Sequence, residues 1–211
     1  MKINISVTTL IFIISILPNQ STAALIDLDW NTANDSALLL DTNSQLQWLD
    51  LSITANQSYN DVSAQLLQGG TYEGFRYATR DEVFQLWSEA GITDTNFTWQ
   101  TNGEWQTIKE LADRFGTSTL FDPHGLGTHA LGMVEGGPTI PANERWVMEI
   151  SYHSNGSEVR TSSNHYTLDV DYASIHYSSY LVQPVPVPPS VLLFLTGFIT
   201  LLLGAIKTSK N

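Results

Sequence analysis

Histidines and carboxylates are the residues of this sequence that could do chemistry, and one group of them lies near the middle of the chain. His124 and His129 are five residues apart in a glycine-rich stretch, with Asp122 before them and Glu135 after them. Two histidines at this spacing do not share a helix face, although a loop could bring them together around a metal ion. The metalloprotease pattern His-Glu-x-x-His is absent, so we predict no metal ligand here.

Two pairs of aspartates could supply oxygen ligands to calcium: Asp27 with Asp29, and Asp169 with Asp171. Neither pair lies in an EF-hand loop or a nonapeptide calcium repeat, so a solvated acidic surface is the simpler interpretation. The chain contains no cysteine, which excludes thiol catalysis and thiolate zinc sites. G-x-S-x-G, P-loop and dinucleotide-binding patterns are also absent, and we predict no catalytic residue and no cofactor.

Arg76, Asp81 and Glu82 form a third charged group, in the stretch "FRYATRDEVFQLW". Arg76 could contact a carboxylate or a sugar hydroxyl of a ligand. The alternative is structural: Glu82 completes a capping box with Thr79, and Arg76 forms an ion pair across the junction between a strand and a helix.

Aromatic side chains are the remaining candidates for ligand binding. Trp99 and Trp105 flank "QTNGE", and three tyrosines cluster late in the chain: Tyr172, Tyr177 and Tyr180. Such rings could stack on sugars, but packing in the core explains most of them equally well.

Several elements must position these groups, and the helix that follows Thr79 is the clearest. Its apolar residues recur at i, i+3, i+4 and i+7, namely Val83, Leu86, Trp87 and Ala90. Gly91 follows them and ends the helix. Helical spacing also marks 59–67 and 104–115, whereas strand composition marks 36–52 (two strands about a turn), 72–78, 129–135, 145–153, 157–163 and 174–183. We therefore predict an α+β fold with an antiparallel sheet and two or three short helices, in which the strand of Trp48 lies beside a strand near 180–182.

The N-terminal residues 1–24 have the layout of a secretory signal peptide. Lys2 precedes an apolar run over 3–17, which is too short for a membrane span of about 20 residues. Thr22 and Ala24 sit three and one residues before a cut at Leu25, and Ser21 with Ala23 permit a cut one residue earlier. An uncleaved anchor is the alternative.

The C-terminal residues 184–211 are proline-rich, then apolar, then basic. Residues 191–206 carry no charge and predict a transmembrane helix, which is followed by Lys207 and Lys210 in a short cytoplasmic tail at 207–211. The segment 184–190 contains Val185, Pro186, Val187, Pro188 and Pro189, and its prolines hold an extended backbone that a processing enzyme could reach.

This three-part tail resembles the PEP-CTERM sorting signal, in its Val-Pro-x-Pro variant. The resemblance implies an exosortase, a membrane transpeptidase, as the partner that cuts near Pro186–Pro189. The chain departs from the family in having no Glu between the prolines, and lysines in place of an arginine cluster.

The body, 25–183, resembles other PEP-CTERM exported proteins in "LLLDTNSQLQWLDL" and in "FRYATRDEVFQLW". The second stretch is also similar to Lcl-type and formylglycine-generating-enzyme-like domains, which implies a C-type-lectin-like fold. Asn43-Ser44-Gln45-Leu46 stands where the family has a Thr-Gly-Leu turn.

The net charge of the body limits the kinds of partner that it could bind. Without Lys2, Lys207 and Lys210 the basic residues fall from 9 to 6 while all 21 acidic residues remain, which leaves the body at about −15. Such a body is not expected to bind nucleic acid, which needs clustered basic residues.

We expect one domain that lies outside the cytoplasm and is anchored in the inner membrane by its C-terminal helix. After cleavage it would reach the cell surface or the medium. It would be non-catalytic and associated with envelope or exopolysaccharide; a secreted hydrolase is the alternative.

Processing of the tail is directly measurable. In a host that carries an exosortase, the released protein should lose the residues that follow the cut near Pro186–Pro189, and its intact mass should fall accordingly. The same chain in a host without the enzyme should keep its C-terminal mass. A full-length C-terminus in both hosts would contradict the prediction.

Overall fold

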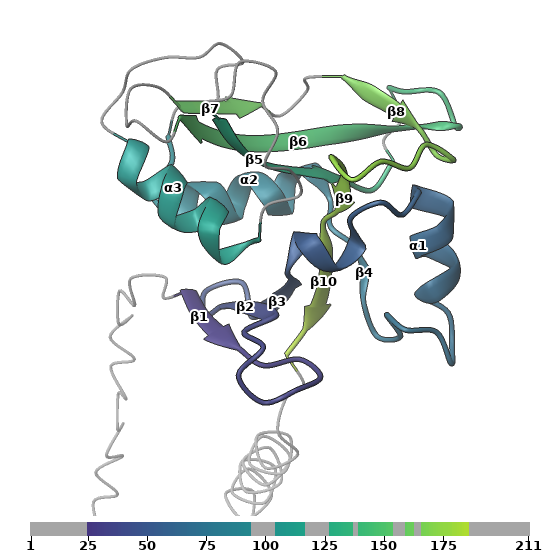
Figure 1. Cartoon of the computed structure of the whole chain (residues 1–211), viewed down its shortest axis with the longest axis horizontal. Helices are drawn as coiled ribbons and strands as arrows, with labels where there is room; N and C mark the ends of the chain where they lie inside the picture. The colour runs from purple at the N-terminus through teal and green to yellow at the C-terminus, as the bar shows by residue number, and fades with distance from the viewer. Residues whose placement is uncertain are drawn as a thin grey trace, which may run out of the picture.

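The computed structural model describes residues 25–93, 104–116, 127–136, 139–153, 159–162 and 166–185. Within these ranges the chain forms three α-helices, one 3₁₀ helix and ten strands that belong to two sheets (Figure 1). The α+β class and the predominance of antiparallel pairing are confirmed. The strands do not form one sheet, however, and one pair is parallel.

The first sheet, sheet A, joins the two ends of the body. Its strands follow the order β1 (Leu25–Leu28), β2 (Leu38–Asp41), β3 (Leu46–Leu49), β10 (Leu181–Pro184), β4 (Arg76–Tyr77), and all neighbours are antiparallel. Trp48 pairs with Val182, as the sequence predicts. The strand expected over 72–78 is reduced to two residues, because Tyr72 to Gly74 form a turn in which Gly74 has a φ of 93°.

The second sheet, sheet B, contains the long strands. Its order is β7 (Val159–Ser162), β6 (Glu144–His153), β5 (Gly127–Met133), β9 (Ser178–Ser179), and β8 (Thr167–Asp169) also pairs with β6. The single strand expected over 174–183 is instead two strands, β9 and β10, which lie in different sheets. Tyr180 alone separates them along the chain.

Two of the three helices begin with the caps that their sequences specify. In α1 (Tyr59–Gln65) and α2 (Arg80–Glu89) a hydroxyl and a carboxylate form a complete capping box. The predicted pair, Thr79 with Glu82, is confirmed, and Gly91 ends α2 with a φ of 93°. The third helix, α3 (Trp105–Arg114), has no side-chain cap; the short 3₁₀ helix η1 covers Leu51–Thr54.

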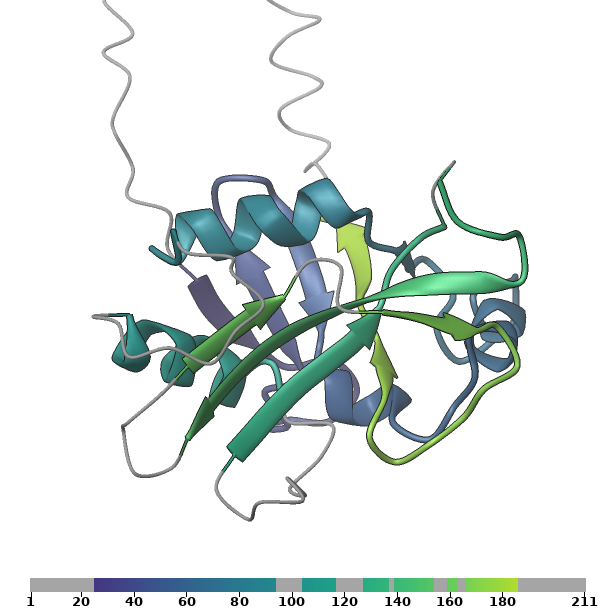
Figure 2. The same ribbon diagram turned by 90° about the horizontal axis from the view of Figure 1, so that it is seen from above.

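The main core lies where α2 and α3 pack between the two sheets (Figures 1 and 2). Its largest fully buried side chains include Trp87 of α2, Trp48 of β3, Phe115 and Tyr180. The Trp48 ring meets Phe115 and Tyr180 edge to face, at centroid distances of 5.9 and 6.3 Å. A second cluster joins α1 to sheet A, and a third joins β5 and β6 to tyrosines around β8 and β9.

The targeting segments lie mostly outside the described residues. This applies to Ala23 and Ala24, to Pro186–Pro189, to the predicted span 191–206, and to Lys207 and Lys210. Val185 is described, and its N–H donates to the carbonyl of Gln45 at 3.0 Å. Within the described ranges, no helix has the length and apolar character that crossing a membrane requires.

Replacing Trp87 tests the core. The side chain is fully buried, and removing a buried Trp typically costs about 3–5 kcal/mol of unfolding free energy. We expect Trp87→Ala to lower the urea midpoint strongly or to prevent folding. Leu67→Ala is the control, because Leu67 is 68% exposed and its loss should change stability by less than about 0.5 kcal/mol. Equal midpoints for the two variants would contradict this packing.

Candidate functional site

A cleft of about 360 Å³ opens at the N-terminal end of α2, and it gathers several of the candidate residues. We call it the α2 cleft; it is lined by Thr79, Arg80, Asp81, Glu135, Gly136, Thr139 and Trp146. Asp81 and Glu135 belong to separate groups of candidate residues in the sequence, and the structure places both on this one cleft.

Backbone hydrogen bonds fix the walls of the α2 cleft relative to each other. The N–H of Glu135 donates to the carbonyl of Ala78 at 2.8 Å, which ties the segment after β5 to the start of α2. The N–H of Val134 donates to the carbonyl of Trp146 at 3.1 Å, which ties the same segment to β6. These bonds hold the segment that carries Glu135 against the start of α2 and against β6.

Arg76 and Glu82 are paired beside the cleft rather than free for a ligand. The guanidinium donates to both carboxylate oxygens of Glu82, with Nη1–Oε2 at 2.8 Å and Nη2–Oε1 at 2.5 Å. The hydrogen bond from Arg76, together with those from Thr79, lowers the pKa of Glu82 to about 2. The structural interpretation of these two residues is confirmed.

Arg80 and Trp146 supply the aromatic and cationic surface of the α2 cleft. The Arg80 guanidinium carbon lies 5.5 Å from the centroid of the Trp146 ring and 6.0 Å from that of Phe84. Its Nε is buried with no hydrogen-bond partner. Sequence reasoning missed both residues, because Trp146 reads only as a strand residue and Arg80 only as the first residue of a helix.

The α2 cleft thus combines a half-buried indole, a guanidinium and two exposed carboxylates within one hollow. Sugars are bound by this kind of mixture, since aromatic rings contact their apolar faces and charged groups hydrogen-bond their hydroxyls.

His129 belongs to a buried polar cluster in sheet B. Its Nδ1 lies 3.0 Å from Glu149 Oε1 and 2.9 Å from Ser151 Oγ, and Ser151 donates to Glu149 at 2.5 Å. A catalytic triad places the serine and the acid on opposite imidazole nitrogens, whereas here both contact Nδ1. The cluster therefore lacks the geometry of a nucleophilic triad. His124 and Asp122 lie outside the described residues.

The aspartate pairs are engaged by donors of the protein itself. Asp29 accepts from the N–H of Ser36, and Asp27 lies 3.9 Å from Nε of Arg114. The N–H of Asp171 and the amide of Asn143 both donate to Asp169, and these bonds hold its pKa below the usual range. In the part of the chain that the structure describes, no three carboxylates or histidines are grouped as a metal site would require.

The predicted aromatic candidates divide between core and surface. Tyr180 is fully buried, and Trp105 is half-buried with its Nε1 donating to the carbonyl of His153 at 3.0 Å. Tyr177 is held by Tyr166, whose hydroxyl donates to its own at 2.8 Å, whereas Tyr172 is 45% exposed. Trp99 lies outside the described residues.

No family model, no curated protein and no solved structure matches this chain.

The ion pair beside the α2 cleft gives a pH-dependent prediction. Because the pKa of Glu82 is lowered from 4.5 to about 2, its pairing stabilises the fold above about pH 4.5 and is lost as the pH falls toward 2. Glu82→Gln keeps an oxygen for the helix cap but removes the charge. The wild type should therefore lose up to about 1 kcal/mol relative to Glu82→Gln between pH 5 and pH 2.5 in urea titrations.

Asp81→Asn is the matched control for this measurement, because it removes a carboxylate from the same helical turn without touching the cap. It should follow the pH dependence of the wild type. If Glu82→Gln also follows it, the ion pair contributes nothing.

Proposed function

We propose that the chain is an exported envelope or exopolysaccharide-associated protein whose body binds glycan at the α2 cleft without catalysis. In this proposal residues 184–211 act as a sorting signal of the PEP-CTERM type. An exosortase-type membrane transpeptidase is the processing partner. The body lies outside the cytoplasm, anchored in the inner membrane until the tail is cut and on the cell surface or in the medium afterwards.

The observation that carries the glycan part is the contact between Arg80 and Trp146 in a cleft that also contains Asp81 and Glu135. The strongly acidic body would repel anionic polymers at long range, so a neutral or weakly charged polysaccharide suits it best.

The C-type-lectin-like comparison forms part of the proposal. What supports it is that strands from both ends of the body, β1 to β3 and β10, lie in one sheet. The capped helix α2 also packs its apolar face against the core, as the similarity of "FRYATRDEVFQLW" to such domains implies.

A secreted hydrolase is the second candidate, and the two carboxylates of the cleft favour it. Glycoside hydrolases act through a pair of Asp or Glu side chains across the scissile bond. Asp81 and Glu135 are exposed and come from different elements, so they could contact one bound sugar from two sides.

Affinity gel electrophoresis tests the binding. The purified protein should be retarded in gels that contain hydroxyethyl cellulose, dextran or galactomannan, and not in gels without polysaccharide. Trp146→Ala and Arg80→Gln should each raise the dissociation constant obtained from the retardation about tenfold, which corresponds to roughly 1.4 kcal/mol of binding free energy. Trp30→Ala is the aromatic control, since Trp30 stacks on Tyr72 away from the cleft.

Two results would contradict the binding proposal: no retardation by any of the three polymers, or equal retardation of wild type and both cleft variants. Release of reducing ends from a polymer, abolished in Glu135→Gln, would establish the hydrolase instead.

A further inference from the structure

Arg80 differs from the other cations of the body in having no polar partner. Among the side chains that the structure describes, the other Lys and Arg residues are held by hydrogen bonds to carboxylates or carbonyls: Arg76, Lys109, Arg114 and Arg145. Arg80 forms neither a hydrogen bond nor an ion pair within the described ranges. In a chain with 21 acidic and 9 basic residues, a shortage of carboxylates does not explain this.

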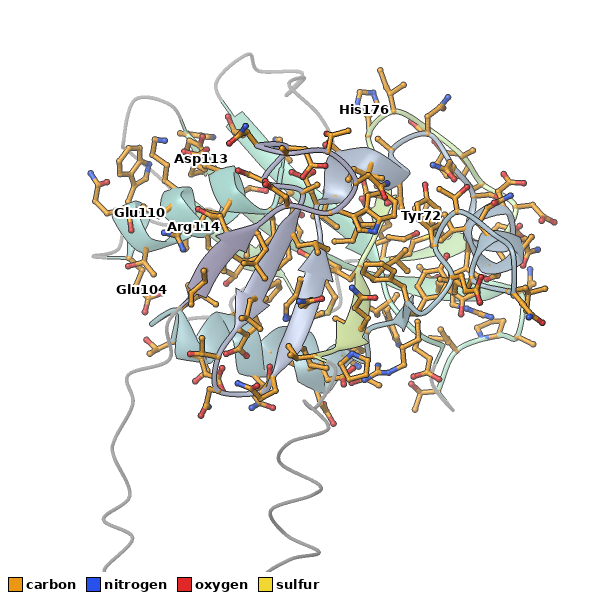
Figure 3. The ribbon with its side chains drawn as sticks, turned by 90° about the horizontal axis from the view of Figure 1, so that it is seen from below. Tyr72, Glu104, Glu110, Asp113, Arg114 and His176 are labelled. Atoms are coloured by element: carbon orange, nitrogen blue, oxygen red, sulfur yellow. The ribbon has the colours of Figure 1, made fainter. Side chains whose placement is uncertain are left out.

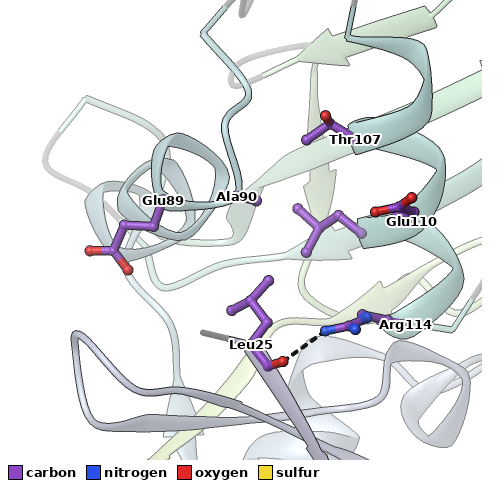
Figure 4. Close-up of a pocket in the computed structure, with 7 residues that line it drawn as sticks. Leu25, Glu89, Ala90, Thr107, Glu110 and Arg114 are labelled. Atoms are coloured by element: carbon purple, nitrogen blue, oxygen red, sulfur yellow. Dashed lines mark hydrogen bonds between the residues drawn. The ribbon is translucent and has the colours of Figure 1, made fainter. Parts of the chain in front are cut away.

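Arg114 shows the usual arrangement of a guanidinium in this body. Figure 3 shows it on α3, near Glu110 and Asp113. It lines a hollow of about 290 Å³ at the start of β1, where its Nη1 donates to the carbonyl of Leu25 at 2.8 Å (Figure 4). Its Nε lies 3.9 Å from Asp27. The cation that lines this second hollow is therefore already engaged by the protein.

Two aromatic rings hold the Arg80 side chain at the α2 cleft. Trp146 and Phe84 lie on its guanidinium, and its buried Nε has no hydrogen-bond partner, so the inner edge of the fork is covered. The Nη1 and Nη2 atoms have no partner either, but they are not buried. The outer edge of the fork is therefore open at the cleft that Arg80 lines.

A second guanidinium lies close to the same cleft. Arg145 has its guanidinium carbon 4.1 Å from the centroid of the Tyr59 ring, and its Nη1 donates to the carbonyls of Ala142 and Glu144 at 2.9 and 2.7 Å. A Cβ at Gly136, which lines the cleft, would lie 3.3 Å from this guanidinium. Arg145 has no ion pair with a described carboxylate, so its charge adds to that of Arg80.

The two carboxylates of the α2 cleft do not neutralise Arg80. Asp81 lies in the first turn of α2, where its charge complements the partial positive charge of the helix end. Glu135 acts on Arg76, whose pKa is raised mainly by Glu82 and to a smaller extent by Glu135. At exposed positions solvent weakens the repulsion that these carboxylates exert on an anion, whereas a direct contact with the guanidinium fork keeps its strength.

We propose that the α2 cleft binds a uronic acid residue of a sparsely charged polysaccharide, with the sugar carboxylate on Nη1 and Nη2 of Arg80. The inference rests on the glycan binding proposed above and names the class of sugar. A guanidinium fork matches a carboxylate, which it binds through two parallel hydrogen bonds. Hydroxyl groups of the same sugar can donate to Asp81 and Glu135, and its apolar face can contact Trp146.

Charge favours a uronate over other anions. A phosphate monoester carries about −1.5 to −2 at neutral pH and would be placed next to Asp81 and Glu135, whereas a uronate carries a single charge. An acidic peptide, or a polymer with a carboxylate on every unit, would be repelled by the strongly acidic body. Isolated uronates among neutral sugars therefore suit both the unpaired cation and the net charge.

Calorimetric titration of the full-length protein in detergent tests the proposal. The ligands are oligosaccharides of glucuronoxylan and of gellan, in which single glucuronates lie among neutral sugars, and the same oligosaccharides after reduction of the carboxyl group to an alcohol. The wild type should bind each acidic form about tenfold more tightly than its reduced form, because only the acidic form offers a charged acceptor to the fork.

The variants ask whether Arg80 reads the carboxylate. The preference for the acidic form should disappear in Arg80→Gln and fall to about threefold or less in Arg80→Lys, which keeps the charge but loses the planar fork. Lys109→Gln is the matched control, because it removes a cation that is paired with Asp113 on α3, and it should keep the full preference. Arg80→Lys keeps the test decisive if Arg80→Gln fails to fold or to bind.

Each contrary result has a separate meaning. Equal affinity of the wild type for acidic and reduced forms overturns the inference and leaves glycan binding at the α2 cleft standing. A full preference that survives in Arg80→Gln or Arg80→Lys also overturns it, because the carboxylate is then bound elsewhere. Absence of binding to all of these oligosaccharides overturns it as well, whereas retardation by the neutral polymers decides separately whether the proposed function survives.

Discussion

The packing of Tyr180 on the backbone of Gly132 is the constraint on which the rest of the body depends. A Cβ at Gly132 would lie 2.5 Å from the Tyr180 ring, so only glycine permits the contact. The N–H of Tyr180 donates to the carbonyl of Met133 in sheet B, and its carbonyl accepts from Ala78 beside sheet A. This one residue therefore connects the two sheets at the point where the chain passes from β9 to β10. Its complete burial raises the pKa of its phenol, which stays neutral in the core.

Local sequence signals predicted the parts of this fold that depend on neighbours in the chain. The capping box of Thr79 and Glu82, the helix end at Gly91 and the turn before β3 all follow from short-range chemistry. The division into two sheets was not predictable in this way. It depends on the chain leaving one sheet at Tyr180, and residues 174–183 have strand composition on both sides of that point.

The candidate sites show the same limit. Asp81 and Glu135 are 54 positions apart by their numbers, and no periodicity relates them; long-range backbone bonds such as that from Glu135 to Ala78 bring them to one cleft. The burial of Glu149 beside His129 could not be predicted from the sequence either, since a glutamate in a strand usually faces solvent. Helix α2 borders two hollows: the α2 cleft at its first turn and, at its last turn, a second hollow that Leu25, Glu89 and Arg114 line.

The position of β10 within sheet A has a mechanical meaning for a protein tethered by its C-terminus. Strand β10 is hydrogen-bonded on both sides, to β3 and to β4, and the bond from Val185 to Gln45 extends this pairing to the last described residue. A pull on the tail along the strand axis loads these bonds in shear, so that several must break together. Strand β1, which among the described residues pairs with β2 alone, is an edge strand and could be peeled away one bond at a time. Under the tether that we propose, drag on the body would therefore be transmitted into the centre of sheet A.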